Sequence, residues 1–220
     1  MTSHLDVVFL DVGGPIYGDR PYYDALWRAI AEARPEASES RFWEEFEACR
    51  HDQKGPFTRR LVRAFLPESE LPRVIDRGRQ LWSYPPEALH SDVLPALEAL
   101  HDTYRLGLLA NQEEWIRETL SRDGLDRFFS IWIVSGELGV EKPDPAIFHA
   151  AVRAAQVAAD RCAMVGDRLD NDIIPARAVG MRTVWLLRGE APEQPTPQQL
   201  DHADRSVRSL TELSAALQRL

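Results

Sequence analysis

The most informative stretch of this chain is Val7-Val8-Phe9-Leu10-Asp11-Val12-Gly13-Gly14. Its first four residues are all apolar and do not alternate with polar ones, so they predict a β-strand with both faces buried. An aspartate and two glycines then end the apolar run, as at the start of a turn. Strands of this kind belong to parallel sheets that are covered by helices on both sides.

The rest of the chain repeats this alternation of short apolar runs and amphipathic stretches. Further strands are predicted at residues 106–109, 131–134, 162–165 and 183–187. Helices are predicted near residues 92–102, 113–123, 145–157, 171–179 and 209–219. The pattern predicts an α/β fold with a doubly wound parallel sheet, that is, a Rossmann-like core.

Residues 17–90 break the alternation, because no strand is predicted among them. They contain helical stretches near 21–33, 39–50, 57–66 and 68–82, separated by prolines and by a Lys-Gly-Pro turn. Pro15 and Gly18 flank this region at its start and Pro85-Pro86 at its end, as where a chain leaves and rejoins a domain. We therefore expect a core of residues 1–16 and 91–220 with an inserted α-helical domain at 17–90.

Composition and charge exclude several classes of protein. The 220 residues are 44% hydrophobic and 28% charged, which is typical of a globular chain. The net charge of −9 argues against a binder of duplex nucleic acid or of an anionic membrane, since both need a basic face. No apolar run approaches ~20 residues, and no secretory signal is evident at the N-terminus, so we expect a cytoplasmic protein. The oligomeric state is left open.

Polar residues end the predicted strands, and ligands of open parallel sheets bind at that edge. In chain order these residues are Asp11, Asn111, Lys142 and the pair Asp167 and Asp172. Lys142 stands out because the chain has only one other lysine, Lys54. The set combines an anionic nucleophile, a neutral donor, a cation and two carboxylates that can bind a metal. Such a set suits phosphoryl transfer, which depends on in-line placement and charge neutralisation.

These ordered motifs resemble the haloacid dehalogenase superfamily of aspartyl-nucleophile hydrolases, with a helical cap inserted after the first motif. The resemblance covers almost the whole chain, including a strand and a helix in residues 206–220. It implies that Asp11 is the nucleophile, that Asn111 orients the phosphoryl group and that Lys142 neutralises charge. It also implies Mg²⁺ as cofactor. The ligands of the ion would be Asp11, the backbone carbonyl of Gly13, Asp167 and Asp172.

The substrate side of the site is expected to combine residues of the motifs with residues of the cap. The candidate contacts are Gly14, Ala110, Tyr17, Lys54, Arg59 and Arg60. The basic segment from Arg50 to Arg63 is expected to overhang Asp11 and offer a cation to an anionic substrate. The alternative is that this segment is a solvent-exposed helix face with no contact to the substrate.

Two departures from the family pattern concern the chemistry directly. The family's phosphatases usually carry a second aspartate, the general acid and base, two residues after the nucleophile, and here that residue is Gly13. The second motif usually offers a hydroxyl where Ala110 stands. Positioned acid and base groups contribute about 10²- to 10⁴-fold to a rate, so the chemistry is weakened, rerouted or lost. Tyr17, Tyr22 and His51 are candidate substitutes in the cap.

Three functions are consistent with these candidate site residues. We favour a Mg²⁺-dependent phosphatase, a phosphoric monoester hydrolase, that acts on a small phosphorylated metabolite such as a sugar phosphate. A dehalogenase also lacks the second aspartate, but it needs no metal and would leave Asp167 and Asp172 idle. A non-catalytic relative that binds a phosphorylated ligand or a protein would explain both losses, yet it has no reason to keep several mutually repelling carboxylates.

Overall fold

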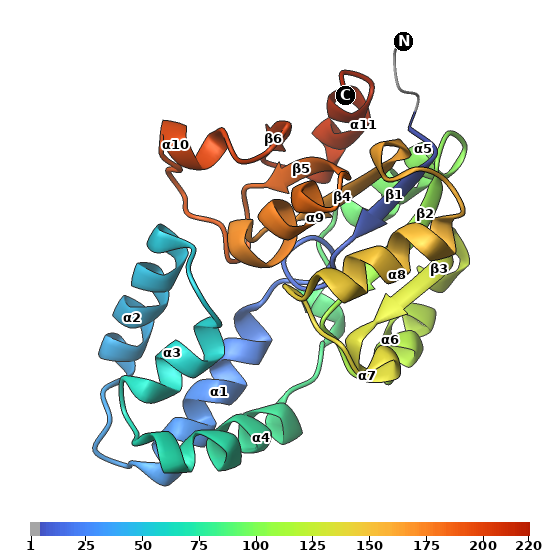
Figure 1. Cartoon of the computed structure of the whole chain (residues 1–220). Coiled ribbons are helices and arrows are strands. Elements are labelled where there is room, and N and C mark those ends of the chain that lie inside the picture. The colour runs from blue at the N-terminus through green and yellow to red at the C-terminus, as the bar shows by residue number, and fades with distance from the viewer. Residues whose placement is uncertain (1–4) are drawn as a thin grey trace.

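The computed structural model describes residues 5–220, and its centre is the strand β1, Val7–Leu10. β1 lies in a six-stranded sheet of the described residues, in the order β3-β2-β1-β4-β5-β6. Every adjacent pair in this sheet is parallel (Figure 1). The other strands are β2 Arg105–Ala110, β3 Phe129–Val134, β4 Cys162–Gly166, β5 Arg182–Leu186 and β6 Arg205–Val207. The predicted α/β class and doubly wound parallel sheet are confirmed.

Alternate side chains of β1 enter two different hydrophobic layers, because successive residues of a strand point to opposite faces. Val8 and Leu10 pack with the helices α5 Val93–His101, α6 Ile116–Arg122 and α11 Leu213–Leu217. Val7 and Phe9 pack with α8 Pro145–Ala155 and α9 Ile174–Ala178. β1 is thus buried on both faces, and polar residues come only beyond its ends.

Several predicted helices are shorter in the structure than in the sequence pattern. The stretch 171–179 becomes a single π-helical turn, Leu169–Ile173, followed by α9, which has Pro175 in its first turn. Residues 209–219 divide into a 3₁₀ turn, Leu210–Glu212, and α11. Two helices of one turn each, α7 Ser135–Leu138 and α10 Pro197–Leu200, were not expected from the periodicity because they are too short to have one.

Between β1 and α5 the chain forms four helices: α1 Arg20–Ala33, α2 Glu39–Asp52, α3 Phe57–Arg63 and α4 Leu71–Leu81. We call residues 17–90 the helical unit; it extends from one end of the sheet in Figure 1. It has a hydrophobic cluster of its own around Phe42, Phe57 and Leu61. α1 and α4 approach closely at Gly78, where a Cβ would lie 3.3 Å from the Leu26 Cα.

The two crossings between the sheet and the helical unit run side by side and are joined by backbone hydrogen bonds. The Gly18 N–H donates to the Ala88 carbonyl at 2.8 Å, and the His90 N–H donates to the Ile16 carbonyl at 3.1 Å. This pairing holds the helical unit at the carboxyl end of β1. Among residues 5–220 no helix is both long enough and apolar enough to cross a membrane.

Candidate active site

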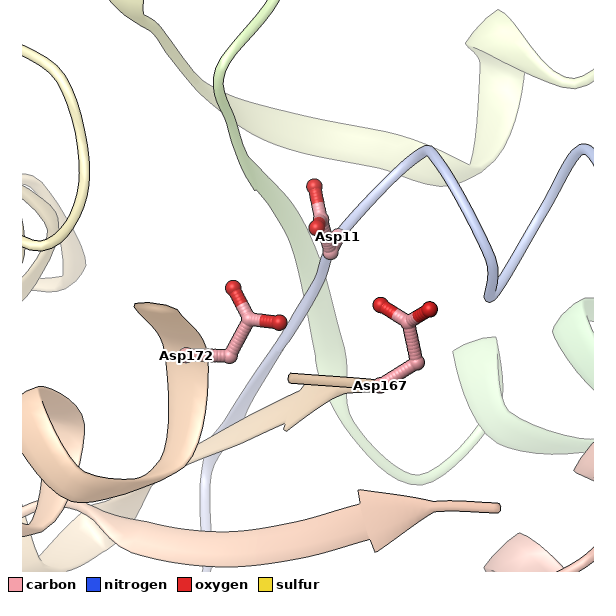
Figure 2. Close-up of side chains that lie close together, drawn as sticks. All are labelled: Asp11, Asp167 and Asp172. Carbon is pink, nitrogen blue, oxygen red and sulfur yellow. The ribbon is translucent and has the colours of Figure 1, made fainter. Parts of the chain in front are cut away.

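Three carboxylates converge at the carboxyl ends of β1 and β4. Asp11 follows β1 directly, and its N–H donates to the Val165 carbonyl of β4 at 2.9 Å. Asp167 follows β4, and Asp172 belongs to the π-helical turn after it. One oxygen from each of the three carboxylates lies within 4.8 Å of the other two. Figure 2 shows the three side chains around one common space, as the strand-end rule predicts.

Glycines make room for this convergence. A Cβ on Gly14 would lie 2.3 Å from the Asp167 Oδ2, and Gly14 also has a φ of +79°, which side chains disfavour. A Cβ on Gly166 would lie 2.5 Å from the Asp172 Cβ. The predicted substrate contact Gly14 is buried and therefore shapes the packing around Asp167.

Lys142 supplies the positive charge at the centre of the site. Its side chain is fully buried, and the Nζ lies 2.9 Å from the Asp11 Oδ2 and 2.6 Å from the Asp172 Oδ1. Burial lowers the pKa of Lys142, but the charges of Asp11 and Asp172 outweigh it and raise that pKa above its usual value. The ammonium therefore stays charged and holds the two carboxylates together.

Burial destabilises the charged forms of the Asp11 and Asp167 carboxylates. Burial raises the pKa of Asp11 to about 6, although the Lys142 charge acts in the opposite direction. Burial also raises the pKa of Asp167 well above its ordinary value, and the neighbouring carboxylates of Asp19 and Glu190 add to this. The Glu190 N–H partly compensates the charge of Asp167, because it donates to the Asp167 Oδ2 at 2.6 Å. A divalent cation bound among these oxygens would remove the repulsion, and oxygen donors are those that Mg²⁺ prefers.

Asn111 is bound to the backbone of Lys142. Its Oδ1 accepts the Lys142 N–H at 2.7 Å, and its Nδ2 donates to the Lys142 carbonyl at 2.9 Å. The amide thus fixes the loop that carries the central cation. Asn111 also faces the cavity described next, and its predicted contact with a phosphoryl group stays a prediction.

A cavity of about 910 Å³ separates the carboxylates from the helical unit. Asp11, Asn111 and Lys142 line one side of it, and residues 55–59, which include the start of α3, line the other together with the helix α4. Arg59, in α3, lies on the cavity wall and pairs with Glu68, with Nη2 and Oε1 2.6 Å apart. Part of the segment predicted to overhang Asp11 therefore faces the same space.

Other residues predicted to contact substrate lie within residues 5–220 but do not line this cavity. Lys54 is exposed, and Arg60 donates to Asp52 Oδ1 at 2.6 Å. Tyr17 is fully buried, and its hydroxyl donates to Asp123 at 2.7 Å, away from the site. Ala110 is also fully buried within its strand. The side chains of Tyr17 and Arg60 are thus engaged elsewhere by their partners Asp123 and Asp52.

The comparisons with known proteins agree with this geometry. The sequence model of a family described as haloacid dehalogenase-like hydrolase matches residues 5–180. The chain belongs to this family. The matched range begins before β1 and ends after α9, so it contains Asp11, Asn111, Lys142 and both carboxylates of the last motif.

Curated relatives of this haloacid dehalogenase-like hydrolase match parts of the chain. A phosphoserine phosphatase of Thermus thermophilus is 39% identical over 150 residues, which are 64% of this chain and 59% of the relative. A glyceraldehyde 3-phosphate phosphatase of Methanopyrus kandleri is 40% identical over 105 residues, 46% of this chain and 44% of the relative. The chain thus spans about half the length of the curated relatives it matches.

Solved structures match over almost the whole length. A HAD phosphatase from Thermococcus onnurineus is 28% identical with a TM-score of 0.62, covering 97% of this chain and 98% of that one. A haloacid dehalogenase-like family hydrolase from Streptococcus pneumoniae has a TM-score of 0.76 at 16% identity, covering 98% of this chain and 99% of the other. The second likeness concerns the fold alone.

Sequence reasoning missed several residues of this hydrolase that line the cavity: Asp19, Tyr84, Gln112, Arg168 and Glu190. Glu190 comes soon after β5, so the strand-end rule that found Asp11 could have found it. Asp19 lies at the beginning of α1, and no local signal distinguishes it from an ordinary helix cap. Its pKa is raised well above the usual value by burial and then by Glu190 and Asp11.

Contacts between the helical unit and the loops after β4 and β5 close one side of the cavity. The buried Gln53 donates to the Glu190 carbonyl at 2.6 Å and accepts the Leu169 N–H at 3.0 Å. Arg50 donates to the Ala191 carbonyl at 2.7 Å, and Tyr23 donates to Glu190 at 2.6 Å. Side chains from both parts of the chain therefore build the site together.

Proposed function

We propose that this hydrolase is a Mg²⁺-dependent phosphatase that acts on a small phosphorylated metabolite through an aspartyl-phosphate on Asp11. The observation that carries the proposal is the fully buried Lys142, whose Nζ bridges Asp11 and Asp172 at 2.9 and 2.6 Å. A cation held against the nucleophile reduces the repulsion that an approaching phosphate would meet.

The carboxylate donor set is suited to Mg²⁺. Asp11, Asp167 and Asp172 would hold the ion together with the backbone carbonyl of Gly13, and the raised pKa values of Asp11 and Asp167 reflect burial without enough counter-charge. When bound, the ion supplies Lewis-acid stabilisation of charge on the phosphoryl oxygens. Asp11 attacks phosphorus, Lys142 balances charge, and Asn111 holds the Lys142 backbone in register.

The cavity supports a small and anionic substrate. Arg59, Arg79 and Arg168 line it from three different segments, so a phosphate can pair with cations among the carboxylates that also line the cavity. Curated relatives named for phosphoserine, glyceraldehyde 3-phosphate and phosphoglycolate support a substrate of a few carbon atoms.

We further propose that residues 17–90 act as a cap domain over a catalytic core of residues 1–16 and 91–220.

The experiment is a screen of phosphorylated metabolites for release of inorganic phosphate, with Mg²⁺ and with EDTA. We expect turnover of one or more small phosphate esters with Mg²⁺, and loss of it with EDTA or in the Asp11→Asn variant. A 2-haloacid in the same screen, followed by halide release, tests carbon chemistry. Halide release that persists in EDTA, without any phosphate release, would replace this function by dehalogenation.

A further inference from the structure

Gly13 stands where the family's phosphatases usually have their second aspartate, but the space beside it is filled. A Cβ on Gly13 would lie 2.9 Å from the Asp19 Oδ1 and 3.3 Å from the Tyr84 hydroxyl oxygen. The backbone of Gly13 is not in the left-handed region, so conformation alone does not exclude a side chain there. The Asp19 carboxylate occupies the position that the missing side chain would otherwise take.

The Asp19 side chain is turned away from its own helix. Asp19 is the N-cap residue of α1, a position where aspartate usually accepts a hydrogen bond from the first turn, yet it makes no such bond. Its Oδ2 is buried and has no hydrogen-bond partner among the described residues. Asp19 lines the cavity that also contains Asp11 and Gly13. The carboxylate therefore faces the reaction site instead of capping the helix.

We propose that Asp19 is the general acid and base of this enzyme, a carboxylate contributed by the helical unit in place of one at residue 13. The proposal rests on the phosphatase function proposed above. In the first step an Asp11 oxygen bonds to phosphorus, the bond from phosphorus to the leaving oxygen breaks, and the Asp19 carboxyl gives that oxygen its proton. In the second step the Asp19 carboxylate takes a proton from water, the water oxygen bonds to phosphorus, and the bond to Asp11 breaks. Inorganic phosphate leaves, and both residues return to their starting forms.

Tyr84 is the competing candidate, because its hydroxyl also adjoins the Gly13 position. That hydroxyl accepts a hydrogen bond from Gln112 Nε2 at 3.3 Å, and burial raises the pKa of Tyr84 well above its ordinary value. A phenol that keeps its proton can donate one but cannot activate water in the second step. Asp19 can serve both steps.

The test compares two esters of similar shape, phenyl phosphate and p-nitrophenyl phosphate, whose leaving groups differ in their need for a proton. Asp19→Asn keeps the size of the side chain and removes the acid. We expect turnover of phenyl phosphate to fall about 10²- to 10⁴-fold, with a smaller effect on formation of nitrophenol. The second step should then limit the variant, giving a burst of nitrophenol and a trapped phosphoryl group on Asp11. Asp24→Asn, which changes an exposed carboxylate on the same helix paired with Arg20, is the matched control.

A double variant tests the position directly. Gly13→Asp alone should not raise the rate, because its Cβ would lie 2.9 Å from the Asp19 Oδ1. Gly13→Asp combined with Asp19→Ala frees that space and should recover phenyl phosphate turnover relative to Asp19→Ala alone. Equal losses on both esters without a burst, or a burst in Tyr84→Phe and none in Asp19→Asn, would overturn the role of Asp19. A wild type inactive toward both esters, with no trapped Asp11, overturns the proposed function and this proposal with it.

Discussion

Replacing Lys142 by methionine removes the central charge while keeping an unbranched apolar chain of similar length. In the structure the Lys142 side chain has no exposed surface, and its Nζ forms ion pairs with Asp11 and Asp172. Without the ammonium, two buried carboxylates would face each other without a counter-charge. Breaking a buried ion pair by removing one partner destabilises a protein by about 3–5 kcal/mol. For a chain of 220 residues this corresponds to a loss of roughly 6–20 °C in Tm.

The loss should depend on pH, because a carboxyl can take up a proton when its cation is gone. Burial already raises the pKa of Asp11 to about 6, and removal of Lys142 takes away an interaction that lowers it. Protonated Asp11 carries no charge to be compensated. The destabilisation should therefore be smaller near pH 5 than near pH 8.

Thermal unfolding followed by circular dichroism in EDTA, at both pH values, measures these effects. Lys54→Met is the matched control, since Lys54 is the only other lysine and is exposed. We expect that control to change Tm little, and added Mg²⁺ to restore part of the stability of Lys142→Met. If Lys142→Met lost no more stability at pH 8 than Lys54→Met, the reasoning about the buried charges would be refuted.

Three further predictions concern the same site. Asn111→Leu removes both hydrogen bonds to the Lys142 backbone and should cost roughly 1–3 kcal/mol in urea unfolding; an activity loss at unchanged stability would instead indicate a direct phosphate contact. Because the folded pKa of Asp11 is raised to about 6, its protonation stabilises the metal-free fold at low pH, and this contribution is lost as pH rises through about 4 to 6. The increase in Tm caused by Mg²⁺ should therefore grow over that interval, and a constant increase from pH 4.5 to 7.5 would contradict the prediction. Arg79→Ala, on the cavity wall, should raise KM more than it lowers kcat, whereas Arg73→Ala, exposed on the same helix, should change neither; equal effects of the two would remove Arg79 from the substrate contacts.

The strands of the sheet, the longer helices and the convergence of the motif residues follow from the sequence pattern alone. Apolar runs such as residues 7–10 identify strands buried on both faces, and their carboxyl ends meet at one edge because the strands are parallel. Asp11, Lys142 and Asp172 could therefore be assigned to one site without coordinates. Asp11 and Asp172 are positioned by the strand and the turn that carry them, which is local information, whereas the Lys142 loop is also held by the side chain of Asn111.

What faces these residues across the cavity depends on the tertiary structure. The directions of side chains in the helical unit depend on how α1 to α4 pack against each other and against the loops after β4 and β5, and these contacts join residues far apart in the chain. Spacing therefore pointed to Tyr17 and Arg60, whose side chains are bonded elsewhere. It passed over Asp19, which looks like a helix cap in the sequence. The turn after β1, closed by the hydrogen bond from the Gly14 N–H to the Tyr17 carbonyl, brings the start of α1 back beside Gly13, but no residue pattern in that turn gives the direction of the Asp19 side chain.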